Sequence, residues 1–315
     1  MPRPVTADTS SLNRSRSDHV PLGILYMLGA TVMFAGSSAI SKWQVGIYSF
    51  DEVLFFRAIA SLVTIAVIVL PRTGLIVFRT QRLADHAGRS LTQTVAQSCI
   101  IIAFGLMPLG GAVAINFAAP LIATLLAALW LKEAIGLARG AALIAGFAGV
   151  LLVAAPGADT FRIGALFALA NAVLYGSVTA AVRGMTTTES AETLTMYQMV
   201  FLALFFALGL PFFGFVWPTN ADLGALVANG VVNAIGQYWW TRALTMAPPA
   251  AVGPFNYFSL VWALLLGFLF WGEVPTLTLV AGSAVVVGSG LFLLLHESGK
   301  KRRARRIALQ EGEQQ

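Results

Sequence analysis

Charge is scarce in this chain. Charged side chains make up only 11% of the 315 residues, whereas 57% of the residues are hydrophobic. A soluble domain of this length carries far more charge on its surface. The mean hydropathy of +0.79 instead indicates that lipid replaces water around most of the chain. Composition therefore argues against a soluble protein and predicts an integral membrane protein.

Residues that commonly perform chemistry are scarce within the apolar segments. A single cysteine, Cys99, rules out a disulfide framework, and the three histidines, His19, His86 and His296, are expected at the periphery. All 14 acidic residues fall in tails, in loops or at the ends of apolar runs. An intramembrane enzyme or a proton relay needs such groups in the protein interior. We therefore expect no catalytic residue, no metal site and no cofactor.

Ten apolar stretches are long enough to cross a bilayer. A spanning helix needs about 20 mainly apolar residues, and runs such as LVTIAVIVL are apolar on every face, which argues against a β-barrel. The predicted spans are 21–42, 51–70, 90–107, 109–131, 138–156, 162–182, 191–215, 222–245, 249–271 and 277–296. The sequence thus predicts an all-α membrane protein with ten transmembrane helices.

The positions of lysine and arginine predict the orientation of the chain. With a cytoplasmic N-terminus, the cations of the tails and loops lie inside, and only Lys42 and Arg162 lie outside. Both termini are therefore expected in the cytoplasm. Residues 1–20 lack the apolar core of a signal peptide and are expected to form a disordered tail. The basic tail 298–315 is expected to contact anionic lipid and not nucleic acid.

The chain resembles itself at a spacing of 140 residues. The matching pairs are Gln97 and Gln237, Pro108 and Pro248, Asn116 and Asn256, Phe117 and Tyr257, and Glu133 and Glu273. A spacing of 141 aligns the opening helices and places Arg57 on Gln198. Each copy holds five predicted helices, an odd number, so the second copy must enter the membrane in the opposite orientation. We expect two inverted five-helix repeats, 21–157 and 158–297, an arrangement typical of transporters.

The duplicated segments also resemble a known family. The segments AINFAAPLIATLLAALWLKE and PFNYFSLVWALLLGFLFWGE each end in an acidic residue and precede a glycine-rich apolar span. They are similar to the EamA-domain branch of the drug/metabolite transporter superfamily, over nearly all of residues 21–297. The resemblance implies a ten-helix protein of the bacterial inner membrane that moves a small metabolite. The segment SFDEVLFFRAIASL is most similar to riboflavin and S-adenosylmethionine uptake members.

The two copies differ in the position of a proline. Pro120 lies in the middle of its predicted span, whereas Pro254 lies near the start of the equivalent span. Because proline kinks a helix, the sequence predicts kinks at two different depths.

Two arginines lie within predicted spans. Arg57 is about six residues into the second span, and Arg242 is near the end of the eighth. A guanidinium in lipid must face the protein interior or extend to the headgroups, and an interior one is a candidate for substrate contact. Arg57 could instead pair with Asp51 or Glu52 on its own helix.

Duplicated amides and nearby aromatic residues complete the candidate site. The amides both donate and accept hydrogen bonds, and aromatic faces beside them suit a flat heterocycle. The same groups could serve only to pack the helices together. The predicted substrate-binding residues are Arg57, Gln97, Asn116, Tyr175, Gln237, Trp240, Arg242, Asn256 and Tyr257.

The sequence favours a secondary transporter or facilitator of a small polar metabolite, with uptake of a vitamin- or nucleoside-like compound such as riboflavin as the leading hypothesis. An exporter of amino acids or toxic metabolites is the main alternative, because sequence does not reveal direction. An intramembrane enzyme and a non-transporting scaffold are disfavoured. No GxxxxGK[ST] segment suggests ATP binding. The expected partners are the substrate and membrane lipid, and a homodimer is left open.

Overall fold

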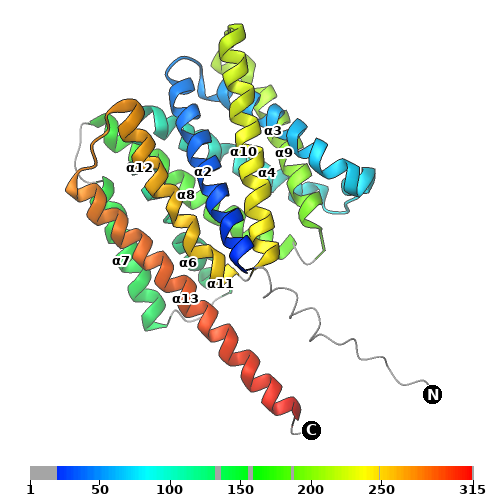
Figure 1. Ribbon diagram of the computed structural model, residues 1–315, viewed down its shortest axis with the longest axis vertical. Helices are drawn as coiled ribbons and strands as arrows, with labels where there is room; N and C mark the ends of the chain where they lie inside the picture. The colour runs from blue at the N-terminus through cyan, green and yellow to red at the C-terminus, as the bar shows by residue number, and fades with distance from the viewer. Residues whose placement is uncertain (1–19, 132–135, 155–158, 186–187, 248, 314–315) are drawn as a thin grey trace.

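The protein is a bundle of helices (Figure 1). The computed structural model describes residues 20–131, 136–154, 159–185, 188–247 and 249–313, and within these ranges no residue lies in a strand. The helices of the first half are α2 (Val20–Val45), α3 (Phe50–Thr73), η1 (Gly74–Phe78), α4 (Leu83–Leu106), α5 (Leu109–Asn116), α6 (Ala119–Leu131) and α7 (Leu137–Ala154). The helices of the second half are α8 (Asp159–Met185), α9 (Ala191–Phe213), α10 (Asn220–Met246), α11 (Pro249–Val252), η2 (Gly253–Tyr257), α12 (Phe258–Trp271) and α13 (Leu277–Glu313).

Eight helical segments of the described chain are long and apolar enough to cross a membrane. They cover every predicted span except the third and the eighth, which correspond to α4 and α10. These two helices have 24 and 27 residues, so length does not set them apart. Their polar side chains lower their hydropathy, because α4 contains Arg89, Gln93 and Gln97 and α10 contains the amides considered below.

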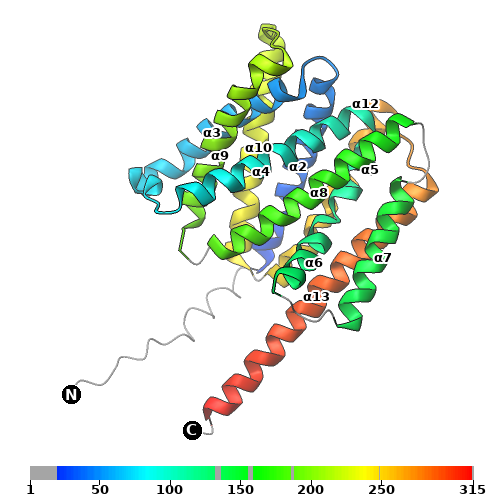
Figure 2. The same ribbon diagram turned by 180° about the vertical axis from the view of Figure 1, so that it is seen from behind.

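The two faces of the bundle show matching sets of helices. Helices α2, α10 and α12 lie on the near face in Figure 1, and α8, α4 and α6 lie on the near face in Figure 2. Helix α10 packs on α2 as α4 packs on α8, and α12 packs on α2 as α6 packs on α8. The flanking helices α7 and α13 pack on each other. Helices of one half therefore pack largely against helices of the other half.

The fourth predicted span of each half is interrupted. In the first half, α5 ends at Asn116 and α6 begins at Ala119. Pro120 has no N–H to donate to the carbonyl of Asn116, which explains why the helix cannot run through. In the second half, the short η2 helix ends at Tyr257, which is equivalent to Phe117. This helix contains Pro254 and continues directly into α12, so the interruption of the second half begins earlier in its span than that of the first half and ends at the position equivalent to Phe117. Kinks at different depths stay a prediction.

Several helix boundaries differ from the prediction. Helix α13 continues to Glu313, so much of the predicted tail 298–315 is helical and projects from the bundle (Figure 1). Helix α4 begins at Leu83, seven residues before the predicted span, because Arg89 and the polar residues around it lower the hydropathy there. His86 was expected at the periphery but is fully buried. The predicted tail 1–20, except Val20, lies outside the described residues.

Close helix packing fixes the interior. Gly230 of α10 lies against α3, where an added Cβ atom would be 2.5 Å from the Cβ of Ala60 and 2.6 Å from the carbonyl oxygen of Arg57. Gly176 of α8 lies against α6 in the same way, with an added Cβ atom 2.9 Å from the carbonyl oxygen of Ala119. The central core contains α5, whose Leu109, Ala112 and Ile115 side chains are fully buried.

Candidate functional site

The two helix breaks meet inside the bundle. The rings of Phe117 and Tyr257 lie 4.7 Å apart between centroids. Asn116 precedes Phe117, and its Oδ1 accepts a hydrogen bond of 2.6 Å from Nδ2 of Asn171 on α8. Asn256 precedes Tyr257 and is half-buried, and its side chain makes no hydrogen bond with the described residues. The breaks thus place a paired amide, an unpaired amide and two aromatic rings in one region.

A second polar contact joins α3 and α4. The Nη2 atom of Arg57 donates to Oε1 of Gln97 at 2.5 Å, and both residues are half-buried. The structure therefore brings together two residues of the predicted site. Asp51 and Glu52, the alternative partners, make no ion pair with Arg57. The amide acceptor leaves the positive charge of Arg57 without a carboxylate within ion-pair distance.

Polar residues recur every fourth position on α4 and on α10, and we call these sets the polar stripes. The stripe of α4 is Arg89, Gln93 and Gln97, and the stripe of α10 is Asn229, Asn233 and Gln237. Each residue of the first stripe is 140 positions before its counterpart in the second. Residues four apart share one face of a helix. Each stripe begins with a buried residue and ends with a half-buried glutamine.

The first residues of the α10 stripe bind neighbouring helices. The Nδ2 atom of Asn229 donates to Ser41 and Gln44 of α2, and its Oδ1 accepts from Ser37. Asn233 donates to the hydroxyl of Ser61 on α3 at 3.3 Å. Asn229 therefore acts in packing.

Gln237, the last residue of the stripe, makes no side-chain hydrogen bond with the described residues. It thus has donors and acceptors available for a ligand.

The remaining predicted residues lie on α8 and α10. Tyr175 on α8 is 43% exposed. Trp240 packs in an apolar cluster with Met27 and Phe255 between α10 and the start of α2. Arg242 is half-buried in the last two turns of α10. The structure thus associates Trp240 with packing.

An ion pair closes the end of the bundle opposite the chain termini. Nζ of Lys42, at the end of α2, lies 3.0 Å from Oε1 of Glu273 and donates to the carbonyl oxygens of Phe104 and Met107. The other oxygen of Glu273 accepts from the N–H of Leu109, the first residue of α5. Lys42 and Glu273 together thereby join α2, the end of α4, α5 and the α12–α13 loop. Its predicted counterpart, Glu133, lies outside the described residues.

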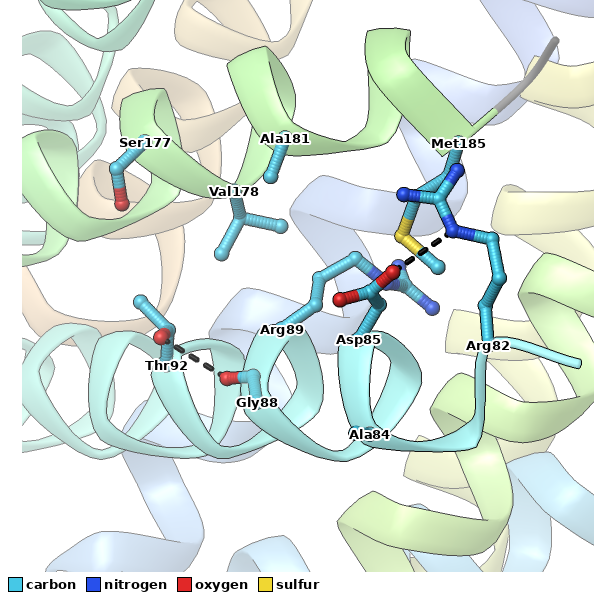
Figure 3. Close-up of a pocket in the computed structure, with 10 residues that line it drawn as sticks. All are labelled: Arg82, Ala84, Asp85, Gly88, Arg89, Thr92, Ser177, Val178, Ala181 and Met185. Atoms are coloured by element: carbon cyan, nitrogen blue, oxygen red, sulfur yellow. Dashed lines mark hydrogen bonds and ion pairs between the residues drawn. The ribbon is translucent and has the colours of Figure 1, made fainter.

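A cavity of about 470 Å³ lies between α4 and α8, near the start of α4 (Figure 3). Its lining includes Arg82, Asp85, Arg89, Thr92 and Ser177. None of the nine predicted binding residues lines it. The cavity is therefore distinct from the helix breaks.

Comparison with known proteins identifies the family of this chain. The sequence pattern of the EamA-like transporter family matches residues 21–155 and matches again at 162–295. The chain belongs to the EamA-like transporter family. The eight apolar helical segments among its described residues and its family membership make it a multi-pass protein of the bacterial inner membrane that transports a small metabolite, as the sequence predicted.

Individual relatives of this EamA protein span nearly its whole length. A riboflavin transporter of Vibrio cholerae is 30% identical over 301 residues, covering 92% of this chain and 99% of the relative. A riboflavin transporter of Rhizobium johnstonii is 29% identical over 286 residues, covering 90% of this chain and 94% of the relative. The pseudopaline exporter CntI of Pseudomonas aeruginosa is 26% identical over 284 residues, covering 90% of this chain and 99% of the exporter. A crystal structure of a protein with 22% sequence identity shares the fold, with a TM-score of 0.60 over 89% of this chain and 98% of the other.

Sequence reasoning missed several polar residues of this EamA protein. Asn171 was missed because the equivalent position of the first half is Ala30, so the search for repeated amides passed over it. Arg89 and Asn229 were missed because their residue types differ, although their spacing is the same as that of Gln97 and Gln237. A search for polar positions four apart at the 140-residue offset would have found both stripes.

Proposed function

We propose that this EamA protein takes up riboflavin, or a closely similar flat heterocycle, by binding it where the two helix breaks meet. The supporting observation is the combination of the unpaired Asn256 amide with the Phe117 and Tyr257 rings at that point. Aromatic faces can stack on a flat ring, and an amide can pair with its polar edge. Two riboflavin transporters align with nearly the whole chain, which agrees with this choice of substrate.

The proposal includes ten spans in two inverted repeats, 21–157 and 158–297. Helices α4 and α10 then also cross the membrane, with their polar stripes turned toward protein and away from lipid. Equivalent helices pack across the two halves, α10 on α2 and α4 on α8, and this symmetry supports the arrangement. The contact of Phe117 with its equivalent Tyr257 supports a pseudo-two-fold axis between these rings. Substrate sites of inverted-repeat transporters lie at such interfaces, beside broken helices.

The proposed orientation places both termini in the cytoplasm. The described ends, at Val20 and Glu313, lie toward the same end of the bundle (Figure 1). The positive-inside rule assigns that end to the cytoplasm because the basic residues of the loops and tails gather there. The Lys42–Glu273 ion pair then closes the periplasmic end.

Growth of a bacterial strain that cannot make riboflavin provides the test. We expect expression of this chain, and not of an empty vector, to restore growth at low external riboflavin. The variant Asn256→Leu, matched for membrane abundance, is expected to restore growth poorly. Growth with the chain no better than with the empty vector, or equal rescue by Asn256→Leu, would contradict the proposal.

Export is the second candidate, and the alignment with the pseudopaline exporter favours it. Cells preloaded with labelled riboflavin distinguish the two directions. An importer speeds accumulation from outside, whereas an exporter speeds loss from loaded cells into medium kept free of riboflavin by washing. We expect the expressed chain to speed accumulation from a low external concentration.

A further inference from the structure

We propose that the cavity between α4 and α8 binds the phosphate headgroup of an anionic phospholipid from the cytoplasmic leaflet. The proposal rests on the orientation given above but not on the identity of the transported substrate.

The charge at the cavity calls for an anion. Arg89 lines the cavity and is only 7% exposed. Its guanidinium donates to Oε1 of Gln198 at 3.0 Å and to the carbonyl oxygen of Leu194 at 2.9 Å, which are both uncharged acceptors. Its Nε is buried without a hydrogen-bond partner, and no described carboxylate lies within ion-pair distance. A buried cation without a counter-charge is costly, and a bound anion would lower that cost.

The rim of the cavity adds a second cation. Arg82 lines it and donates from Nε to Oδ2 of Asp85 at 2.7 Å. Two arginines against one carboxylate leave the lining with a net positive charge. Thr92 and Ser177 also border the cavity (Figure 3), but their hydroxyls donate to the carbonyl oxygens of Gly88 and Leu174 on their own helices. The two guanidinium groups are the donors that suit the oxygens of a phosphate.

The surroundings of the cavity identify the occupant as a lipid. Farther from the cytoplasmic end, α4 exposes Leu91 and Val95, and α8 exposes Val173. These side chains are available to acyl chains, while the arginines lie near the level of the headgroups. Basic pockets between transmembrane helices on the cytoplasmic side are known to hold anionic headgroups. Riboflavin is uncharged and does not need a buried cation, so we assign the cavity to lipid.

The test measures retained lipid by native mass spectrometry and thermal stability in detergent with added phosphatidylglycerol or phosphatidylcholine. Gly88→Leu is the blocking variant, because an added Cβ atom at this cavity-lining glycine meets no atom within 4 Å and the side chain would enter open space. Gly224→Leu on α10 is its control, since that position is also open but does not line the cavity. Arg82→Gln removes a charge, and Arg79→Gln is the control at an exposed arginine nearby.

We expect the unmodified protein to retain phosphatidylglycerol in preference to phosphatidylcholine, with a higher melting temperature in its presence. Arg82→Gln should weaken phosphatidylglycerol binding about fivefold, as expected for one surface arginine, and Gly88→Leu should abolish the preference. Both controls should retain it. Equal retention by Gly88→Leu, or no preference in the unmodified protein, would overturn the proposal. Stabilisation by inorganic phosphate alone would overturn the lipid assignment. Each readout is independent of riboflavin transport.

Discussion

At the scale of single residues, the two duplicated asparagines differ in their partners. Asn116 is engaged by Asn171, whereas the side chain of Asn256 makes no hydrogen bond with the described residues. Asn116 therefore contributes to packing as well as to any binding, and Asn256 has its full hydrogen-bonding capacity available to a substrate. The repeated sequence alone could not show this difference, because the partner Asn171 is not repeated.

The first prediction uses this difference. Asn256→Leu should lower riboflavin transport about tenfold, the effect of losing about 1.4 kcal/mol of hydrogen bonding, and should leave the melting temperature unchanged. Asn116→Leu should also lower the melting temperature, because the amide of Asn171 loses its acceptor at a cost of about 1–3 kcal/mol. Transport assays and thermal unfolding of the purified variants provide the comparison. A lower melting temperature for Asn256→Leu would indicate that this asparagine serves packing.

The second prediction concerns Arg57. The second half carries Gln198 at the equivalent position, so the fold accepts an amide there. If Arg57 contacts the substrate, Arg57→Gln should reduce transport at least tenfold with normal amounts of protein in the membrane. Arg57→Lys keeps the charge but loses the planar guanidinium, and should be intermediate. Transport by Arg57→Gln at the unmodified rate would remove this arginine from the site.

At the scale of helices, the packing of α3 on α10 depends on Gly230. An added methyl group would collide with the backbone of α3. We predict that Gly230→Ala lowers the melting temperature or the yield of folded protein, because overpacking costs about 1–3 kcal/mol. Gly224→Ala on the same helix is the control, since nothing lies within 4 Å of the added atom. Unfolding curves that coincide for the two variants would show that α3 and α10 can separate freely.

Hydropathy predicted the helices well, including α10 to within two residues at each end, but placed the start of α4 too late. The apolar runs located all eight described segments that are long and apolar enough to cross a membrane. Arg89 was assigned to a loop because a charge ends an apolar run, although the helix continues through it and buries it. The extension of α13 was not predicted, because a polar helix leaving a membrane has no hydrophobic signal. The interruption near Phe117 was predicted as a proline kink, but the contact of Phe117 with Tyr257 required the structure.

At the scale of the whole molecule, the proposed inverted arrangement predicts which loops are accessible from each side. The single native cysteine allows a clean test, since Cys99→Ser leaves a chain free of cysteine. Cysteines placed at the exposed positions Ile47 and Trp217 should react with a maleimide that reaches the periplasm but does not cross the inner membrane. A cysteine at the exposed Leu75 should react only after the inner membrane is opened. Labelling of position 75 in intact inner membranes would refute the orientation.

The two halves also suggest how the molecule could work. Each half packs largely on the other, and the rings of Phe117 and Tyr257 meet between them. Exchanging the conformations of equivalent halves would open the site to either side of the membrane in turn. Breaking the Lys42–Glu273 contact, which closes one end, would be part of that exchange.

The central claim is that this chain transports riboflavin through a site at the helix breaks. Uptake of labelled riboflavin by liposomes containing the purified protein tests it most directly. We predict saturable uptake that unlabelled riboflavin competes away, with uptake by Asn256→Leu reduced about tenfold at equal reconstitution. Uptake no faster than in protein-free liposomes, or undiminished uptake by Asn256→Leu, would contradict the account.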